Sequence, residues 1–260
     1  MTLPPQEHLG PGDRIMVVVA HPDDAEFMCS GSVAKWTREG REAVYVIATN
    51  GNKGTSDRDA DPAALAALRE AEQRAACAIL GVETVEFLRY EDGTLQNTLE
   101  LRREVARLIR VHRPSAVVTE DPTARFVGNR VNHPDHRAIG DAAVDAVFPS
   151  ARDFHMWPEM HHEEGLEPHV VDHLYVSGRG GEANVRVDIS ETIEAKIAAL
   201  RAHASQVRNP TPEFDEFVRG MARRNAEGSP YEYAESFRYF YLGARPPSQN
   251  APPPNTPIRA

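Results

Sequence analysis

The sequence predicts an α/β fold in which helices cover both faces of a mostly parallel sheet. Up to residue 147, four apolar runs alternate with four helical segments, a pattern typical of parallel strands joined by crossover helices. The run at residues 14–20, RIMVVVA, is apolar after its first residue, as expected for a strand buried on both faces. Histidines and aspartates gather directly after the first and fourth runs. Together these observations predict an α/β sandwich with its polar site at one end of the sheet.

The four expected strands are short apolar runs rich in valine, with isoleucine and threonine, the residue types that favour a pleated backbone. They are separated by segments that contain glycine, proline or polar turn residues, which mark loops. The expected strands are residues 14–20, 42–49, 84–88 and 115–119.

The four expected helices are marked by start and stop signals. Asp61 and Pro62 suit the beginning of an alanine-rich helix, and Gly81 suits the residue that ends it. Pro114 excludes continuation of the helix before it, and Pro134 opens the next one. The expected helices are residues 25–39, 62–80, 99–112 and 134–147.

The remainder of the chain has a less regular pattern. We expect two more strands at residues 173–177 and 184–189, a helix at 193–207, and helical pieces between 210 and 240. A chain of 260 residues suits one large domain. The expected organisation is a single α/β domain at residues 1–245 that begins with a loose arm at 1–12, followed by a proline-rich, disordered tail at 246–260.

Composition limits the classes of partner. The formal net charge of −10 argues against a nucleic-acid binder, because phosphate contacts require a basic surface. We find neither a signal peptide nor an apolar run of membrane-spanning length, and we expect a soluble, cytoplasmic protein with a small-molecule substrate. Cys29 and Cys77 are expected to be buried free thiols in a reducing compartment. The oligomeric state stays open, and a homo-oligomer is compatible with the sequence.

Topology predicts that the two polar clusters meet. His21, Asp23 and Asp24 follow the first strand, whereas His133, Asp135 and His136 follow the fourth. Right-handed crossovers that reverse direction once give the strand order 3-2-1-4, in which the first and fourth strands are neighbours. Ligands of open α/β sheets bind at the carboxyl ends of such neighbouring strands. We therefore expect one site built from both clusters.

Three of these residues form a candidate metal-ligand set. Catalytic zinc takes three protein ligands of nitrogen or oxygen type and keeps one position open. His21, Asp24 and His136 supply such a set for one ion per chain. A site of two histidines and one carboxylate also suits Fe²⁺, so the sequence does not decide between Zn²⁺ and Fe²⁺.

The other three residues suit acid–base chemistry beside that ion. Asp23 is a candidate general base for a metal-activated water. His133 is a candidate imidazolium that stabilises an oxyanion and protonates a leaving amine, and Asp135 is placed to orient a histidine. These parts predict a hydrolase of amides or esters. In the alternative interpretation, Asp23 and Asp24 only cap the following helix.

The residues around both clusters resemble a known family. VVVAHPDDAE at residues 17–26 and NHPDHR at residues 132–137 are similar to the two signatures of the LmbE/PIG-L family of zinc-dependent N-deacetylases. The segments LREAEQRAACAILGV, RYEDGTL and ALRAHASQ also match the pattern, and the resemblance spans residues 14–243. It implies a Rossmann-like fold and hydrolysis of an N-acetyl group on an N-acetylglucosamine unit. It also implies the metal, base and charge-stabilising roles given above.

The resemblance further implies that Arg69 and Asp92 contact the sugar. The sequence departs from many relatives in having Ala25 before Glu26, and from some in having Val131 where they have a tyrosine that assists the oxyanion. Two other functions remain as alternatives: a metal-dependent phosphoesterase, and a non-catalytic protein that binds metal or sugar on the same fold. A phosphoesterase would require a second group of bridging carboxylates.

Overall fold

The computed structural model describes residues 9–10, 12–178, 183–207 and 211–243. Within these residues a seven-stranded sheet has the order β3-β2-β1-β4-β7-β9-β8, which confirms the predicted beginning 3-2-1-4. The strands from β3 to β7 run parallel, whereas β9 is antiparallel to both of its neighbours. The strands of this sheet are β1 (Arg14–Val19), β2 (Glu42–Thr49), β3 (Thr84–Tyr90), β4 (Ala116–Thr119), β7 (His173–Ser177), β8 (Val185–Asp188) and β9 (Ala234–Tyr241).

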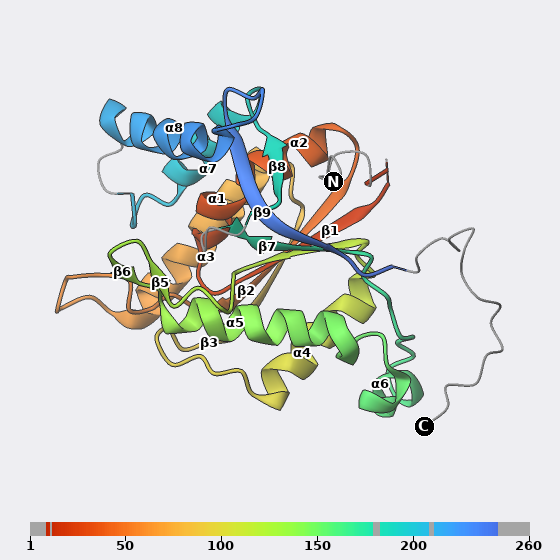
Figure 1. Ribbon diagram of the computed structural model, residues 1–260. Helices are drawn as coiled ribbons and strands as arrows, with labels where there is room; N and C mark the ends of the chain where they lie inside the picture. Colours follow the sequence, from red (N-terminus) through yellow and green to blue (C-terminus); the bar gives the residue numbers. More distant parts are fainter. Residues whose placement is uncertain (1–8, 11, 179–182, 208–210, 244–260) are drawn as a thin grey trace.

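Helices cover both faces of the sheet and give three layers (Figure 1). One face packs against α4 and α5, and the other packs against α1, α2, α3, α7 and α8. The helices are α1 (Asp24–Met28), α2 (Ser30–Arg38), α3 (Pro62–Leu80), α4 (Leu99–His112), α5 (Pro134–Asp145), α6 (Pro158–His162), α7 (Ile193–Ala202) and α8 (Pro212–Ala226).

The packing of the first strand explains why its sequence is apolar from Ile15 onward. Successive side chains of a strand point to opposite faces of the sheet. Val17 and Val19 therefore enter the core beneath α1, α2 and α3, whereas Met16 and Val18 enter the core beneath α4 and α5. All four side chains are fully buried. A strand with only one buried face would instead alternate apolar and polar residues.

The prediction of helical pieces between residues 210 and 240 is wrong for the second half of this segment. Residues 212–226 form α8, but Ala234–Tyr241 form strand β9, which pairs with β7 on one side and β8 on the other. Its sequence, AESFRYFY, is rich in aromatic residues, which favour strands. The strand depends on long-range pairing with β7 and β8, which the local pattern does not show.

The expected helix at residues 25–39 is divided at Cys29, whose φ of −144° is not helical. A buried ion pair occupies the break. The Glu235 carboxylate accepts the N–H groups of Gly31 and Ser32 at the start of α2. The Lys196 ammonium donates to main-chain carbonyls at the end of α1 and contacts Glu235 at 2.6 Å. Helix ends need such partners, so residues distant in the sequence stabilise two short helices instead of one.

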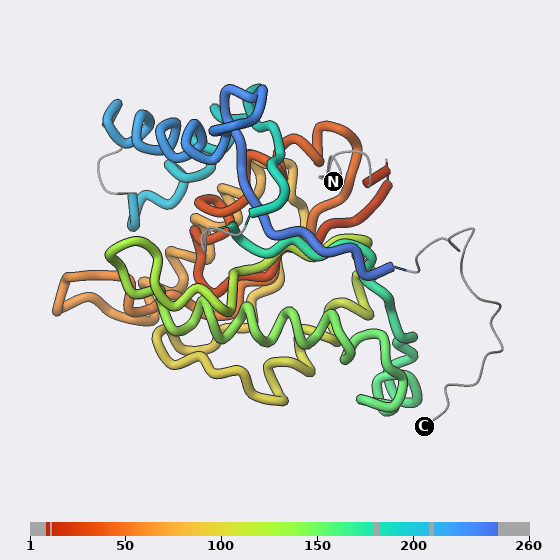
Figure 2. Tube along the Cα trace, in the orientation of Figure 1, coloured from red at the N-terminus to blue at the C-terminus, as the bar shows by residue number. Residues whose placement is uncertain are grey.

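Other differences lie at element ends and in short connections. The helix expected to reach residue 207 ends at Ala202. Helix α5 ends at Asp145, and the chain after it kinks at Phe148, whose φ of −145° and ψ of 121° are not helical. A short 3₁₀ turn follows at Phe154–Met156. Sequence analysis missed the small hairpin of β5 (Phe126–Val127) and β6 (Arg130–Val131), which directly precedes α5 (Figure 2).

The terminal expectations fall mostly outside the described residues. The tail at 246–260 and most of the arm at 1–12 lie there, and Leu9 of the arm is 4% exposed and packs in the core. Both cysteines are buried and free, as expected. Among the described residues, no helix combines the length and apolar character that a membrane crossing requires.

Candidate metal centre

The turn after β1 brings His21 and Asp24 together. The Asp24 carboxylate accepts the backbone N–H of His21 at 2.8 Å, and the Asp24 N–H donates to the His21 carbonyl at 3.2 Å. Asp23, between them, has φ 103° and ψ −22°, a left-handed conformation that is rare for residues with a side chain. As a result, Asp24 Oδ2 lies 3.1 Å from Nδ1 of His21.

The N-terminus of α5 presents the second cluster. His133 caps the helix, because its Nδ1 accepts the N–H of Asp135 at 3.3 Å, and Pro134 begins the first turn. The side-chain oxygen of Asn132 lies 3.0 Å from the His133 N–H and 3.0 Å from Nδ1 of His136. The contact with Asn132 leaves Nε2 of His136 for the turn after β1.

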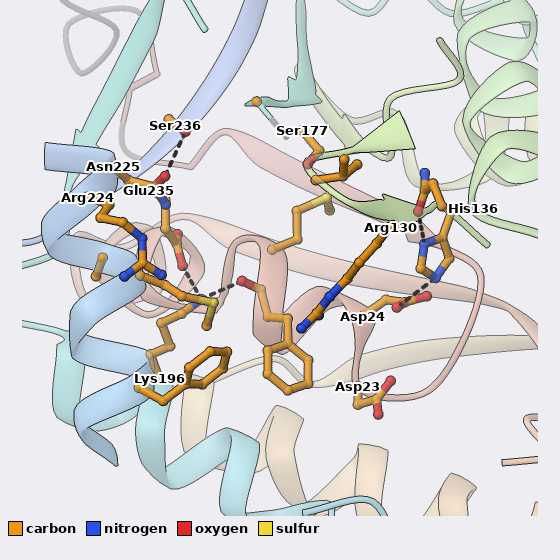
Figure 3. Close-up of a pocket in the computed structure, with 18 of the residues that line it drawn as sticks. Asp23, Asp24, Arg130, His136, Ser177, Lys196, Arg224, Asn225, Glu235 and Ser236 are labelled. Atoms are coloured by element: carbon orange, nitrogen blue, oxygen red, sulfur yellow. Dashed lines mark hydrogen bonds and ion pairs between the residues drawn. The ribbon is translucent and has the colours of Figure 1, made fainter. Parts of the chain in front are cut away.

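The two clusters meet because β1 and β4 are parallel neighbours in the sheet. Asp24 Oδ1 lies 3.1 Å from Nε2 of His136, and Figure 3 shows this contact at the edge of the pocket. The ring of His21 is 4.7 Å from that of His133 and 5.3 Å from that of His136. The structure thus places the three histidines and Asp24 in one cluster.

The donor atoms of this cluster are of the types that hold a divalent cation. In a tetrahedral zinc site with bonds of about 2.1 Å, neighbouring ligand atoms are about 3.4 Å apart. Both contacts of Asp24 with imidazole nitrogens are 3.1 Å long, close to that spacing, but they use different oxygens of the carboxylate. Among the described residues, the groups whose ligand atoms all lie within 4.8 Å of one another include His21 with His133 and His136, and Asp24 with Glu120 and His136, but not His21, Asp24 and His136 together. Two imidazoles and one carboxylate form a donor set common in catalytic metal sites.

In each of the two candidate histidine ligands, His21 and His136, the ring nitrogen that faces away from Asp24 also has a partner. His21 Nε2 lies 3.1 Å from Oδ1 of Asp92 and 3.4 Å from Oδ2 of Asp135. Asp135 is fully buried and accepts the backbone N–H groups of Gly93 and Leu95, but it is 4.0 Å from His133. Metal-binding histidines usually hold a carboxylate or carbonyl oxygen in this way. Asp92 and Asp135 therefore lie where they orient His21.

The pKa values of the cluster reflect its crowded charges. Burial and then the charge of Asp24 raise the pKa of Asp23 to about 7, although Arg69 opposes the shift. Burial would lower the pKa of His136, but the Asp24 carboxylate outweighs it and raises that pKa. Burial and the positive charge of His21 lower the pKa of His133. The pKa of each of these groups therefore depends on the charge of its neighbours.

Arg69 lies behind the turn after β1 and is 3% exposed. Its guanidinium donates to the carbonyl of Pro22 and, at 3.0 Å, to the carbonyl of Gly51, and it lies 3.4 Å from the Asp23 carboxylate. The glycine is required, because a Cβ at position 51 would come within 2.5 Å of the guanidinium and the residue has φ +62°. Arg69 therefore supports the turn that carries Asp23.

A pocket of about 750 Å³ opens from the cluster toward α8 and β9. Asp23, Asp24, His133 and His136 lie at one end, as Figure 3 shows in part. Its lining contains neither Arg69 nor Asp92, the residues implied as sugar contacts. The rest of the wall mixes apolar and charged side chains, among them Phe27, Arg130, Val131, Phe217, Met221 and Arg224.

Sequence analysis missed two polar residues of the cluster. Asn132 orients His136, and Glu120 forms a group of potential ligands with Asp24 and His136. Both carried a signal, since Asn132 directly precedes His133 and Glu120 directly follows β4. The histidine-rich segment at residues 155–162 lies near the last turn of α4, where Arg110 donates to the carbonyls of Trp157 and of the preceding Asp153, at the opposite end of the sheet.

Comparison with known proteins establishes the family. Residues 16–147 match the PIG-L family, described as GlcNAc-PI de-N-acetylase. The chain belongs to the PIG-L family. It is 32% identical to a diacetylchitobiose deacetylase of Thermococcus kodakarensis over 232 residues, which covers 87% of this chain and 82% of the relative.

Two further relatives of the PIG-L family extend this result. The 1D-myo-inositol 2-acetamido-2-deoxy-alpha-D-glucopyranoside deacetylase of a Mycobacterium species is 30% identical over 237 residues, covering 75% of this chain and 74% of that one. The structure of N,N'-diacetylchitobiose deacetylase from Pyrococcus horikoshii superposes with a TM-score of 0.80 at 28% identity, covering 88% of this chain and 84% of that one.

The PIG-L match contains both His/Asp clusters but ends before the far wall of the pocket. Residues 16–147 include the turn after β1 and the start of α5. Phe217, Met221 and Arg224, which line the pocket from α8, lie beyond the match. The family match therefore covers the candidate metal centre, and the far wall of the pocket lies beyond it.

Proposed function

We propose that the protein is a zinc-dependent N-deacetylase that hydrolyses the N-acetyl group of an N-acetylglucosamine-type sugar or conjugate. The observation that carries this proposal is the position of the Asp24 carboxylate, 3.1 Å from one nitrogen of His21 and 3.1 Å from one nitrogen of His136. Asp23 and His133 line the pocket at the same end. Membership of a deacetylase family supports the same reaction.

His21, Asp24 and His136 would hold the zinc ion. Bound zinc supplies a Lewis acid that polarises a carbonyl and lowers the pKa of water. The protein holds the ligand side chains in position before the metal binds. Asp92 and Asn132 fix the rings of His21 and His136, respectively, so that their other nitrogens face Asp24.

Asp23 serves as the general base in this proposal. Its side chain lines the pocket, is 16% exposed and is held from behind by the Arg69 guanidinium. As the water oxygen bonds to the acetyl carbon, the Asp23 carboxylate takes the proton that the water loses. A site that only binds metal needs no general base, so the Asp23 carboxylate favours an enzyme over a non-catalytic binding protein.

In this proposal His133 stabilises the charge on the acetyl oxygen and protonates the leaving amine. Its side chain is 40% exposed at the pocket, and its ring lies 4.7 Å from that of His21. Protonation of Nδ1, which in this structure accepts the Asp135 N–H, would give the imidazolium that stabilises the negative charge developing on the acetyl oxygen. Its proton then passes to the sugar nitrogen as the carbon–nitrogen bond breaks. The products are acetate and a free amine.

The relatives and the pocket support the proposed substrate class. The Thermococcus and Mycobacterium relatives act, by their names, on N-acetylated glucosamine units, one in a disaccharide and one in an inositol conjugate. The pocket continues beyond the metal centre to α8, which leaves room for the second unit of such a substrate. In this proposal Arg69 and Asp92 do not contact the sugar. Arg69 supports Asp23, and Asp92 supports His21.

The test combines bound metal with acetate release. The protein is assayed with N-acetylglucosamine, N,N'-diacetylchitobiose and an N-acetylglucosaminyl inositol, and its zinc content is measured. Asp23→Asn should retain zinc and lower kcat by about 10²–10⁴. Asp141→Asn, an exposed change on the same helix as His136, should leave both unchanged. Undiminished acetate release by Asp23→Asn would exclude this mechanism, and phosphate release from a phosphomonoester panel would favour the alternative reaction.

A further inference from the structure

The backbone of Asp23 is held in an unfavourable conformation by groups outside the metal centre. A left-handed conformation is costly for a residue with a side chain, and it persists only where surrounding contacts enforce it. The Asp23 carbonyl accepts the N–H groups of Glu26 and Phe27 at 3.1 and 3.2 Å. The Asp23 N–H donates to the side-chain oxygen of Gln73, on α3, at 3.1 Å.

The amide of Gln73 is oriented by its partners at both ends. Its nitrogen donates to Oε1 of Glu26 at 3.0 Å, while its oxygen accepts the Asp23 N–H. A backbone N–H only donates and a carboxylate only accepts, so the reversed amide would lose both bonds. Gln73 is fully buried, which makes an unpaired polar atom costly there.

Glu26 is held in turn by His203. Oε2 of Glu26 lies 3.0 Å from Nε2 of His203, and both side chains are fully buried. His203 directly follows α7, the helix that also supplies Lys196. Lys196 donates to the backbone carbonyls of Glu26 and Phe27 at 2.8 and 2.9 Å. Helix α7 therefore holds both the side chain and the backbone of this part of α1.

We propose that His203, Glu26 and Gln73 form a positioning relay, a buried chain of hydrogen bonds that fixes the backbone of Asp23 with its carboxylate beside the metal centre. The inference rests on the proposed function, which gives Asp23 its catalytic role. None of the three side chains lines the pocket, so their effect on the reaction passes through Asp23. They are positioning residues and not catalytic ones.

The direction of the hydrogen bonds permits a swap experiment. Gln73→Glu places a second carboxylate against Glu26 and removes the donor between them. Combining Gln73→Glu with Glu26→Gln restores the order of donors and acceptors from His203 to Asp23 and gives up only the contact of the Gln73 amide nitrogen with the Cys77 sulfur at 3.6 Å. The new amide at position 26 accepts from His203 and donates to position 73, where the new carboxylate accepts the Asp23 N–H. The pair of side chains keeps its summed size and charge.

The relay predicts a loss of rate that the swap reverses. Gln73→Glu should lower kcat about 10–100-fold, with KM and zinc content unchanged, because a misplaced catalytic group costs rate more than binding. The double variant should recover most of that loss. In an Asp23→Asn background, Gln73→Glu should change kcat little, because the group that the relay positions no longer acts as a base.

Glu72→Gln provides the matched control. Glu72 is the neighbour of Gln73 on α3, is 7% exposed, and accepts hydrogen bonds from the backbone and hydroxyl of Ser205 at 2.7 Å. Its substitution should lower the melting temperature and leave kcat unchanged. The proposal is overturned if Gln73→Glu keeps wild-type kcat, if the swap restores nothing, or if the loss is equally large without the Asp23 carboxylate.

Amide hydrogen exchange tests the relay without relying on activity. Exchange at residues 19–27 should be faster in Gln73→Glu and in Gln73→Met, which also serves if the first variant does not fold, and should return to the wild-type rate in the swap. Equal exchange in all variants would overturn the relay. A wild type that binds zinc but releases no acetate would overturn the proposed function alone, since the exchange result stands separately.

Discussion

The carboxylate of Asp24 lies 3.1 Å from Nε2 of His136, although the two residues belong to different halves of the metal centre. Asp24 begins α1 after strand β1, and His136 lies in the first turn of α5. Asp24 is 7% exposed, and a buried carboxylate needs a partner of opposite charge. The Asp24 carboxylate therefore needs a positive partner, which is either a bound metal ion or the protonated imidazole of His136.

Removing a metal ligand should differ from removing its neighbour. We expect His136→Ala to lose bound zinc, because it deletes one of the three proposed ligands. His133→Ala should retain zinc and lose kcat, since the proposed role of His133 is to act on the developing charge. Metal analysis of both variants after dialysis checks the prediction. Equal zinc loss in the two variants would place His133 among the ligands, in keeping with its short ring distance of 4.7 Å to His21.

Asp92→Asn should weaken metal binding rather than substrate binding. Asp92 contacts the second nitrogen of His21 at 3.1 Å, and loss of such a partner typically costs about 10–100-fold in metal affinity or activity. Competition with a zinc-binding dye measures the affinity. If zinc affinity is retained and only KM rises, Asp92 acts on the sugar instead.

Arg69→Met should lower kcat more than it raises KM. The guanidinium holds the turn through the carbonyls of Pro22 and Gly51 and lies 3.4 Å from Asp23, but it does not line the pocket. Steady-state kinetics with N,N'-diacetylchitobiose separate the two effects. A rise in KM at constant kcat would contradict this role and support direct contact with the sugar.

The buried ion pair of Lys196 and Glu235 should have a large effect on stability. Their side chains are 3% and 2% exposed, and removing one partner of a buried pair costs about 3–5 kcal/mol. Lys196→Met should therefore lower the free energy of unfolding by about that amount, measured by urea denaturation. Arg223→Met breaks the exposed pair with Glu216 and should change it by less than about 1 kcal/mol. Similar losses in both variants would refute the distinction.

The regular half of the fold was predictable because its signals are local. Strand β2 and helices α3 and α4 have the predicted bounds, and Asp61 and Gly81 occupy the cap positions of α3 as expected. The break at Cys29 was not predictable, because the Glu235 and Lys196 side chains that stabilise it come from the other end of the chain. Strand β9 was missed for the same reason.

The residues of the candidate site divide in the same way. The two His/Asp clusters were found because each directly follows a predicted strand or opens a predicted helix. The relay was not found, because its bonds join Glu26 to Gln73 and His203 across long sequence separations. The positions of Arg69 and Asp92 behind the site also depend on the loops that carry them, whose paths the sequence pattern does not define.

The sequence by itself determined the layered α/β fold, the strand order 3-2-1-4 and the two clusters that meet, and its two motifs carried the resemblance to the family. The fold, the strand order and the meeting of the clusters follow from periodicity, chirality and residue types at strand ends, which are properties of short segments. Only the tertiary structure decided that α1 and α2 are separate, that Asp92 backs His21, and that Gln73 holds Asp23. Such contacts depend on where side chains from distant segments come to lie, and packing of the whole chain sets those positions.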